Sequence, residues 1–125
     1  MLDKSAIYYP AWQMQCCGRP FRVGSKIHWS CYRTKMVCNG TVIYFYEEHH
    51  LGQTHSVNGT VTKITAEMSE TPIEDGKLTR ETMIYNELRA ADGWESERPD
   101  DERTHRTFLG YIVELKDVTF HELSE

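Results

Sequence analysis

Alternating apolar and polar residues predict strands along much of the chain. Apolar residues occupy every second position from Ile27 to Cys31, which predicts a strand over residues 26–37 with one apolar face. Residues 41–47 are rich in β-branched and aromatic side chains, as buried strands are. Asn39-Gly40 lies between the two segments and is typical of a tight turn. We therefore predict a β-hairpin here.

Further strands are expected on both sides of this hairpin. The first ten residues predict a strand or arm, and residues 56–67 predict another strand. Gly59 interrupts the alternation in that second segment, as a bulge or a sharp curve would. A final strand pair is expected over residues 107–116 and 118–123.

Charged and turn-forming residues predict where the loops lie. Residues 86–107 are charged and polar and contain Asp92-Gly93, so we expect a long, mobile surface loop there. Residues 77–88 fit either a strand or a helix, because their apolar residues suit both spacings. These patterns predict five to seven strands and at most one short helix. Glycines at bends of short curved strands favour a small curved sheet or barrel, OB-like or similar.

Length and composition define the general class of the protein. The 125 residues suffice for a single domain, residues 1–125, and the 39% hydrophobic and 26% charged residues are typical of a globular chain. No apolar stretch approaches the roughly 18 residues that span a bilayer, and the N-terminus lacks a signal-peptide pattern. We therefore expect a cytoplasmic protein with no membrane partner. The net charge of -5 disfavours nucleic acid as a partner, because binding phosphates needs surplus Lys and Arg.

Sulfur and imidazole side chains predict a candidate metal or thiol site. Its residues are Cys16, Cys17, Glu48, His49, His50 and His55. Zinc suits such a mixed cysteine and histidine set, although neither Cys-x-x-Cys nor His-x-x-x-His occurs. The alternative is that one cysteine packs in the core as a small hydrophobe and the histidines are solvated loop residues.

The adjacent cysteines also suggest thiol chemistry. We expect Cys16 and Cys17 not to bridge each other, because neighbouring side chains diverge, and to be reduced in the cytoplasm. A thiol near Arg19 could have a lowered pKa and act as a nucleophile. His49 or His50 would then be its base.

Aromatic and basic residues in the first third of the chain suggest a binding surface. The candidate surface residues are Trp12, Arg22, Lys26 and Arg33. On a small barrel, such residues could stack and neutralise single-stranded nucleic acid, whereas core packing is the alternative interpretation of the aromatics. The chain has no Gly-rich phosphate loop, Gly-x-Ser-x-Gly or His-Glu-x-x-His motif. Nucleotide hydrolysis, serine hydrolase and zincin chemistry are therefore disfavoured.

One segment carries a family resemblance. Residues 12–24 read W-Q-M-Q-C-C-G-R-P-F-R-V-G, which resembles the signature of a family of small bacterial proteins known only as a domain of unknown function. Residues 47–50 with 59–64, and residues 91–95 with 110–115, are similar to its middle and C-terminal blocks. The resemblance implies a bacterial, cytoplasmic protein and no particular activity.

These observations together predict a non-enzymatic binding or regulatory module. It would be a small barrel that presents a loop-built face to a protein or a small ligand, with Trp12 plugging one end and one of the two adjacent cysteines in the core. The first alternative is a zinc-like or thiol-dependent site formed by Cys16 and Cys17 with the histidines at 49 and 50. The second alternative is single-stranded nucleic-acid binding.

Overall fold

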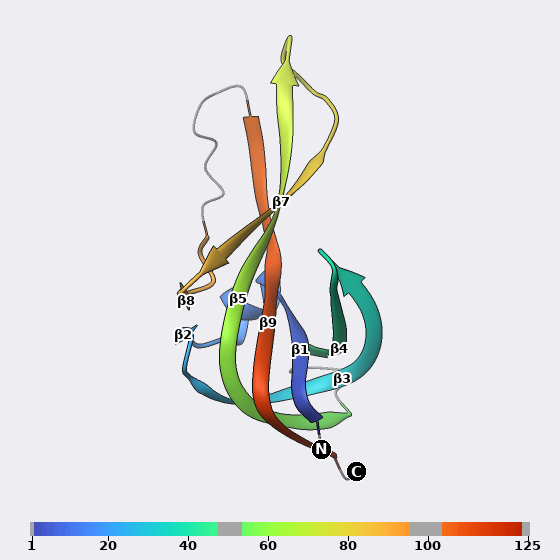
Figure 1. The fold of residues 1–125 in the computed structure, drawn as a ribbon. Coiled ribbons are helices and arrows are strands. Elements are labelled where there is room, and N and C mark those ends of the chain that lie inside the picture. Colours follow the sequence, from blue (N-terminus) through green and yellow to red (C-terminus); the bar gives the residue numbers. More distant parts are fainter. Residues whose placement is uncertain (1, 48–53, 96–103, 124–125) are drawn as a thin grey trace.

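A ring of hydrogen-bonded strands forms the body of the protein (Figure 1). The computed structural model describes residues 2–47, 54–95 and 104–123. The strands follow one another around the ring in the order β3 (Lys26–Cys38), β4 (Thr41–Glu47), β1 (Leu2–Pro10), β9 (Thr104–Glu122) and β5 (His55–Glu74), and β5 pairs again with β3. The predicted fold class is confirmed, because the described chain is mainly β with one short helix.

The ring is not a clean barrel, because one of its contacts is narrow. β1 and β4 run parallel and pair only at Ile7 with Phe45 and at Tyr8 with Tyr46. The other pairs in the ring are antiparallel. The remaining described elements are α1 (Ala11–Cys17), β2 (Phe21–Arg22), β6 (Lys77–Leu78), β7 (Thr82–Leu88) and β8 (Ala90–Ala91).

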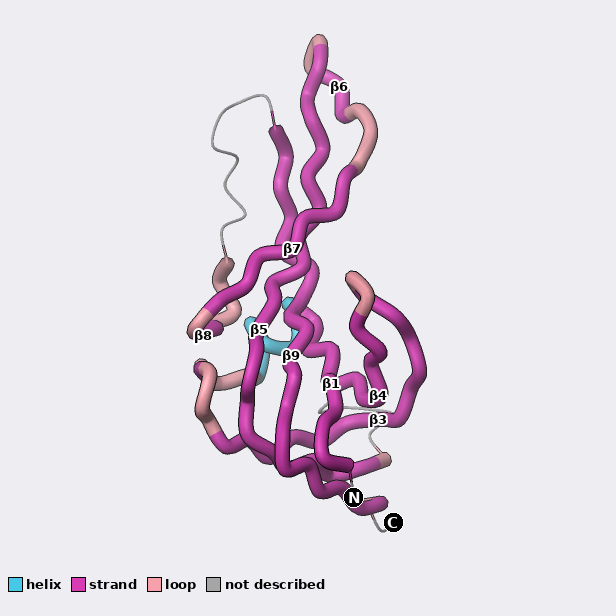
Figure 2. The backbone as a smooth tube through the Cα atoms, viewed as in Figure 1, coloured by secondary structure: helices cyan, strands magenta, loops and turns pink. Residues whose placement is uncertain are grey.

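β5 and β9 continue beyond the ring as a long twisted arm (Figures 1 and 2). Their ladder extends to Pro72 opposite Thr104, and β7 pairs with the outer part of β5. Glu70 and Arg106 face each other on this arm, and the Arg106 Nη2 lies 2.6 Å from a Glu70 carboxylate oxygen. Such a partly exposed pair contributes about 0.2–1 kcal/mol, so the arm depends mainly on its ladder.

The two faces of β1 pack into different apolar clusters, because alternate residues of a strand point to opposite faces. Ile7 and Tyr9 point into the ring and join the main core with Phe45 and Tyr111. Ala6 and Tyr8, on the opposite face of β1, join a second cluster to which the β3–β4 hairpin contributes. The buried residues of this cluster are Ala6, Tyr8, Ile43 and Ile112, and Met36, Cys38, Tyr46 and Tyr85 pack against them.

A buried carboxyl group, that of Glu67, lies beside the second cluster, and each of its oxygens accepts a hydrogen bond from a tyrosine hydroxyl. The Tyr8 hydroxyl donates to Glu67 Oε1 at 2.6 Å, and the Tyr85 hydroxyl donates to Oε2 at 3.0 Å. Burial first, and then the hydrogen bond to Glu67, raise the pKa of Tyr8 well above its ordinary value. The network allows an acid to lie inside an apolar region.

Local sequence signals predicted several elements correctly. The hairpin is present, and Asn39 and Gly40 have φ of 48° and 78°, as a primed turn requires. The β5–β9 register shifts between Asn58 and Thr60, which confirms the irregularity predicted at Gly59. Residues 77–88, which fitted either a strand or a helix, contain β6 and β7.

Two predicted boundaries differ from the structure. The final strand pair is one strand, β9, because Asp117 adopts a left-handed φ of 53° and bends the strand without ending its pairing with β5. The range 86–107, predicted as a loop, contains the end of β7, all of β8 and the start of β9, while residues 96–103 lie outside the described residues. Polar residues in this range do not require a loop, because an edge strand also tolerates charged side chains. Glu87, for example, is exposed on β7.

Candidate functional site

The segment around Trp12 forms helix α1, which packs against β9 and β1. Gln13 and Met14 are buried, whereas Trp12 is 50% exposed. The predictions that Trp12 plugs the barrel and that one cysteine faces the core are therefore wrong, since Cys16 and Cys17 are both exposed. A helix turns once in about 3.6 residues, so Trp12 and Cys16 share its outward face.

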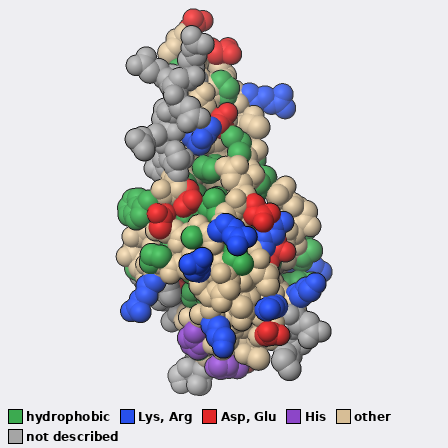
Figure 3. Space-filling view, turned by 60° about the vertical axis from the view of Figure 1, so that its left-hand side comes forward, with side chains coloured by type: hydrophobic (Ala, Val, Ile, Leu, Met, Phe, Trp, Pro, Cys, Tyr) green, Lys and Arg blue, Asp and Glu red, His purple; other side chains and the backbone are tan. Residues whose placement is uncertain are grey.

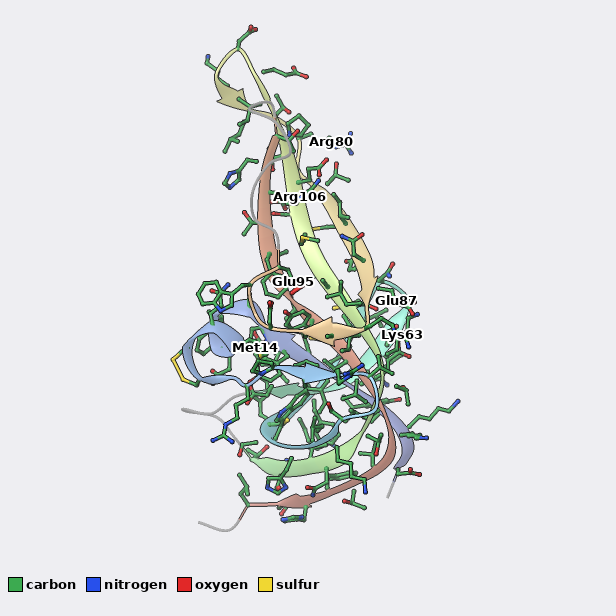
Figure 4. The ribbon with its side chains drawn as sticks, turned by 90° about the vertical axis from the view of Figure 1, so that its left-hand side faces the viewer. Met14, Lys63, Arg80, Glu87, Glu95 and Arg106 are labelled. Carbon is green, nitrogen blue, oxygen red and sulfur yellow. A yellow bond between two sulfur atoms is a disulfide. The ribbon has the colours of Figure 1, made fainter. Side chains whose placement is uncertain are left out.

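The two cysteines form a disulfide with each other at the end of α1, drawn in yellow in Figure 4. The expectation that adjacent cysteines diverge is thus also wrong. Side chains of neighbouring residues point to opposite sides in extended backbone, but Cys16 and Cys17 lie in helical backbone. The remaining cysteines are free, Cys31 in the core and Cys38 half-buried on the same strand.

Helix α1 meets the segment after β8 at Gly93. The Gln15 side chain donates a hydrogen bond to the Gly93 carbonyl at 2.9 Å. A Cβ atom at Gly93 would lie 2.8 Å from Met14 Cγ, so only glycine allows this close packing. Figure 4 shows Met14 and Glu95 on the same side of the body. Two segments distant in the sequence thus form one structural unit.

Tyr111 links this unit to the carboxylate of Glu95. Its hydroxyl accepts the Gly93 N–H at 2.8 Å and donates to Glu95 Oε2 at 3.0 Å. The backbone N–H of Trp94 donates to Asp92 Oδ1 at 2.8 Å, which fixes the second carboxylate of the turn. Both acids therefore have defined positions at one edge of the body.

A pocket of about 420 Å³ opens beside these acids. The small sheet of β2 and β8 forms it, with Phe21 opposite Ala91 and Arg22 opposite Ala90. Its apolar lining residues are Pro20, Phe21, Ala90 and Ala91, and its polar lining residues are Arg22, Ser25, Asp92 and Glu95. An apolar lining with a few fixed polar groups is typical of a small-molecule site.

Burial and a neighbouring acid shift the pKa values of two groups at the pocket, Glu95 and Tyr111. Burial raises the pKa of Glu95 above its ordinary value, the hydrogen bond from Tyr111 opposes that rise, and Asp92 adds to it. Burial likewise raises the pKa of the Tyr111 hydroxyl, which therefore stays a proton donor to Glu95. The carboxyl of Glu95 thus holds its proton more readily than a solvated glutamate.

The predicted metal ligands are not brought together in the part of the chain that the structure describes. Glu48, His49 and His50 lie outside the described residues. His55 is buried on β5 opposite Cys31, where its ring packs beside Phe45 and Phe120. Among the described residues, no three histidine, cysteine or acidic side chains gather as metal ligands. Zinc binding stays a prediction.

The predicted surface residues have different environments. Arg22 lines the pocket, and Lys26 is exposed at the start of β3. The Arg33 guanidinium lies 5.6 Å and 5.2 Å from the ring centres of Phe45 and Phe120, a cation–π arrangement. On the face shown in Figure 3, lysine and arginine side chains are spread over the body with acidic ones among them.

Sequence reasoning missed Gln15, Asp92, Glu95 and Tyr111 as site residues. The expected resemblance of residues 12–24 and 91–95 to two blocks of one family is the signal that could have pointed to them, since these two segments meet at Gly93. Gln13 on the same helix is fully buried, and its amide nitrogen and oxygen have no hydrogen-bond partner among the described residues.

The fold and this site define a small, mainly β protein with a pocket lined by the β2–β8 sheet. Residues 3–117 match the model of a family described as "Family of unknown function (DUF6578)". The chain belongs to this family. No curated protein and no solved structure matches the chain. Within the described residues, the structure contains no helix with the length and apolar character needed to cross a membrane.

Proposed function

We propose that the protein is a non-enzymatic binding module whose ligand occupies the pocket lined by the β2–β8 sheet. The ligand would be a small molecule with an apolar body and a protonated amine. The observation that supports this proposal is the combination of apolar walls with the carboxylates of Asp92 and Glu95, both held by hydrogen bonds. Apolar contact would provide affinity, and the carboxylates would orient the ligand.

The apolar side of the pocket is preorganised by aromatic packing. The ring of Phe21 meets Trp29 edge-on at 5.0 Å and Tyr111 at 5.8 Å between ring centres. Phe21 is therefore held from behind while it lines the pocket. A wall that does not reorganise on binding lowers the entropy cost of association.

The polar side favours a cation. An ammonium group beside Glu95 would favour its charged form, so binding is expected to release a proton from this carboxyl where its raised pKa keeps it protonated. Arg22 also lines the pocket and disfavours a second ammonium group on the ligand. A ligand with one amine and an apolar body fits both conditions.

The lining also supports a binding role over catalysis. Neither cysteine nor histidine lines the pocket among the described residues, and the Ser25 hydroxyl accepts the backbone N–H of Arg22 at 3.0 Å. The Ser25 hydroxyl is thus engaged with the backbone and has no histidine beside it in the described lining, the usual base for a serine nucleophile.

Calorimetric titration of the whole protein with benzylammonium, benzyl alcohol and benzoate tests the proposal. We expect benzylammonium to bind about tenfold more tightly than the other two, which corresponds to about 1.4 kcal/mol. Glu95→Gln should remove this preference, whereas Glu74→Gln, at an exposed position on the arm, should retain it. Equal affinities for the three probes, or an unchanged preference in Glu95→Gln, would refute the proposal.

A further inference from the structure

The cysteine pair at the end of α1 differs from the other cysteines in access to solvent. Cys16 and Cys17 are both exposed and bonded to each other. Cys31 is completely buried, and burial followed by the charge of Glu47 raises the pKa of its thiol. Cys38 is half-buried on β3. Thiol–disulfide exchange needs an accessible sulfur, so the exposed pair is the site for it.

The same helix end is connected to the pocket through named contacts. Gly18 N–H donates to the Met14 carbonyl at 3.0 Å and completes the last turn, which includes both cysteines. Within that turn, Gln15 donates to the Gly93 carbonyl and Met14 packs on Gly93. Gly93 N–H then donates to the Tyr111 hydroxyl, which donates to Glu95.

We propose that Cys16 and Cys17 form a reversible two-electron modification site that regulates the pocket. The reductant would be a small thiol such as glutathione. Its thiolate attacks one protein sulfur, the bond between the two cysteines breaks, and a mixed disulfide forms with the attacked cysteine. A second small thiol attacks that mixed disulfide and leaves as the oxidised small disulfide. The protein gains two electrons and two protons, as two thiols.

The regulatory half of the inference rests on the proposed function of the pocket. A bond between adjacent side chains fixes the peptide that joins them, and its reduction frees the final residues of α1. The contacts of Gln15 and Met14 with Gly93 are in the same turn, so we expect them to loosen on reduction. Since Gly93 orients Tyr111 and thereby Glu95, the oxidised form should bind the amine about fivefold more tightly.

Equilibration of the full chain with mixtures of reduced and oxidised glutathione tests the site. A Cys38→Ser background removes the half-buried thiol from the measurement. After rapid alkylation, mass spectrometry should find both Cys16 and Cys17 unlabelled at high oxidised glutathione and both labelled at high reduced glutathione, reversibly. In Cys16→Ser, Cys17 should instead be free or carry one glutathione. Labelling of the pair that does not depend on the glutathione ratio would overturn the proposal.

The amide resonance of Gly93 and benzylammonium binding, measured in both redox forms, test the coupling. We expect the Gly93 resonance to move on reduction and the affinity to fall about fivefold. A shifted Gly93 resonance with no benzylammonium binding in either form would refute the proposed function but support the redox site and its connection to Gly93. Identical Gly93 resonances and identical affinities in the two forms would overturn the regulatory role.

Discussion

Substitution of Gly93 by alanine tests the junction between α1 and the pocket. Gly93 has a φ of +88°, which side chains with a Cβ rarely adopt, and a Cβ there would lie 2.8 Å from Met14 Cγ. Gly24 provides a matched control, because its φ is +95° and no atom lies within 4 Å of the added Cβ. The two alanine variants thus share the backbone strain and differ in the contact with Met14.

Backbone strain and the contact with Met14 each contribute a separate loss in the free energy of unfolding. A left-handed backbone costs a residue with a Cβ roughly 1–2 kcal/mol, which is the whole cost expected for Gly24→Ala. Gly93→Ala should cost a further 1–3 kcal/mol or so, because Met14 must leave its buried position or α1 must shift. Gly93→Ala is therefore expected to lower the free energy of unfolding by about 2–5 kcal/mol.

Urea unfolding of the single and double variants measures these costs. Met14→Ala alone should lose about 2–5 kcal/mol, since a buried side chain is deleted. It also removes the atom that an added Cβ at Gly93 would meet. The double variant should therefore be more stable than additivity predicts by about 1–3 kcal/mol. Equal costs at Gly93 and Gly24, or additivity within about 0.5 kcal/mol, would refute the reasoning.

Three further predictions concern buried or half-buried polar groups. Tyr8→Phe should lower the free energy of unfolding by about 1–3 kcal/mol. This loss should exceed that of Tyr85→Phe, because Tyr8 is the more buried of the two hydroxyl donors to Glu67. Equal losses of the two variants in urea unfolding would contradict this. Gln13→Met should leave stability unchanged or raise it, since it removes a buried amide without partners among the described residues; thermal melting showing a clear loss would reveal a partner. Folding raises the pKa of Glu95 above 4.5, so the folded state binds more protons than the unfolded state just above pH 4.5. The free energy of unfolding should therefore fall as the pH rises through this range, and Glu95→Gln should abolish that fall in urea unfolding measured at several pH values. An unchanged dependence of the free energy of unfolding on pH in Glu95→Gln would refute the assignment.

The strands could be predicted because their signals are local. Asn39-Gly40 sets a turn by its own backbone preference, and the flanking residues alternate as a strand requires. The irregularity at Gly59 is likewise apparent in the chain itself. Asp117 shows the limit of this approach, because a polar residue with a left-handed φ is compatible with either a turn or a bend within one strand.

Helix α1 and the pocket could not be predicted in the same way. The helix has seven residues and no side-chain hydrogen bond at its N-cap, so its sequence has weak local signals and its stability depends on packing. β2 and β8 contribute two residues each and pair across a long stretch of sequence. The carboxylates of Asp92 and Glu95 gain their environment only from that pairing and from Tyr111.

The most direct test of the proposed binding site is an amide shift map of the isotopically labelled protein titrated with benzylammonium. The proposal predicts that the largest changes fall on the amides of Phe21, Ala91 and Glu95, which line the pocket. A second hollow, lined by residues that include Lys4 and Lys116, should show no saturable change. Saturable changes centred on that second hollow or on the arm, with the resonances of the pocket unmoved, would contradict the account.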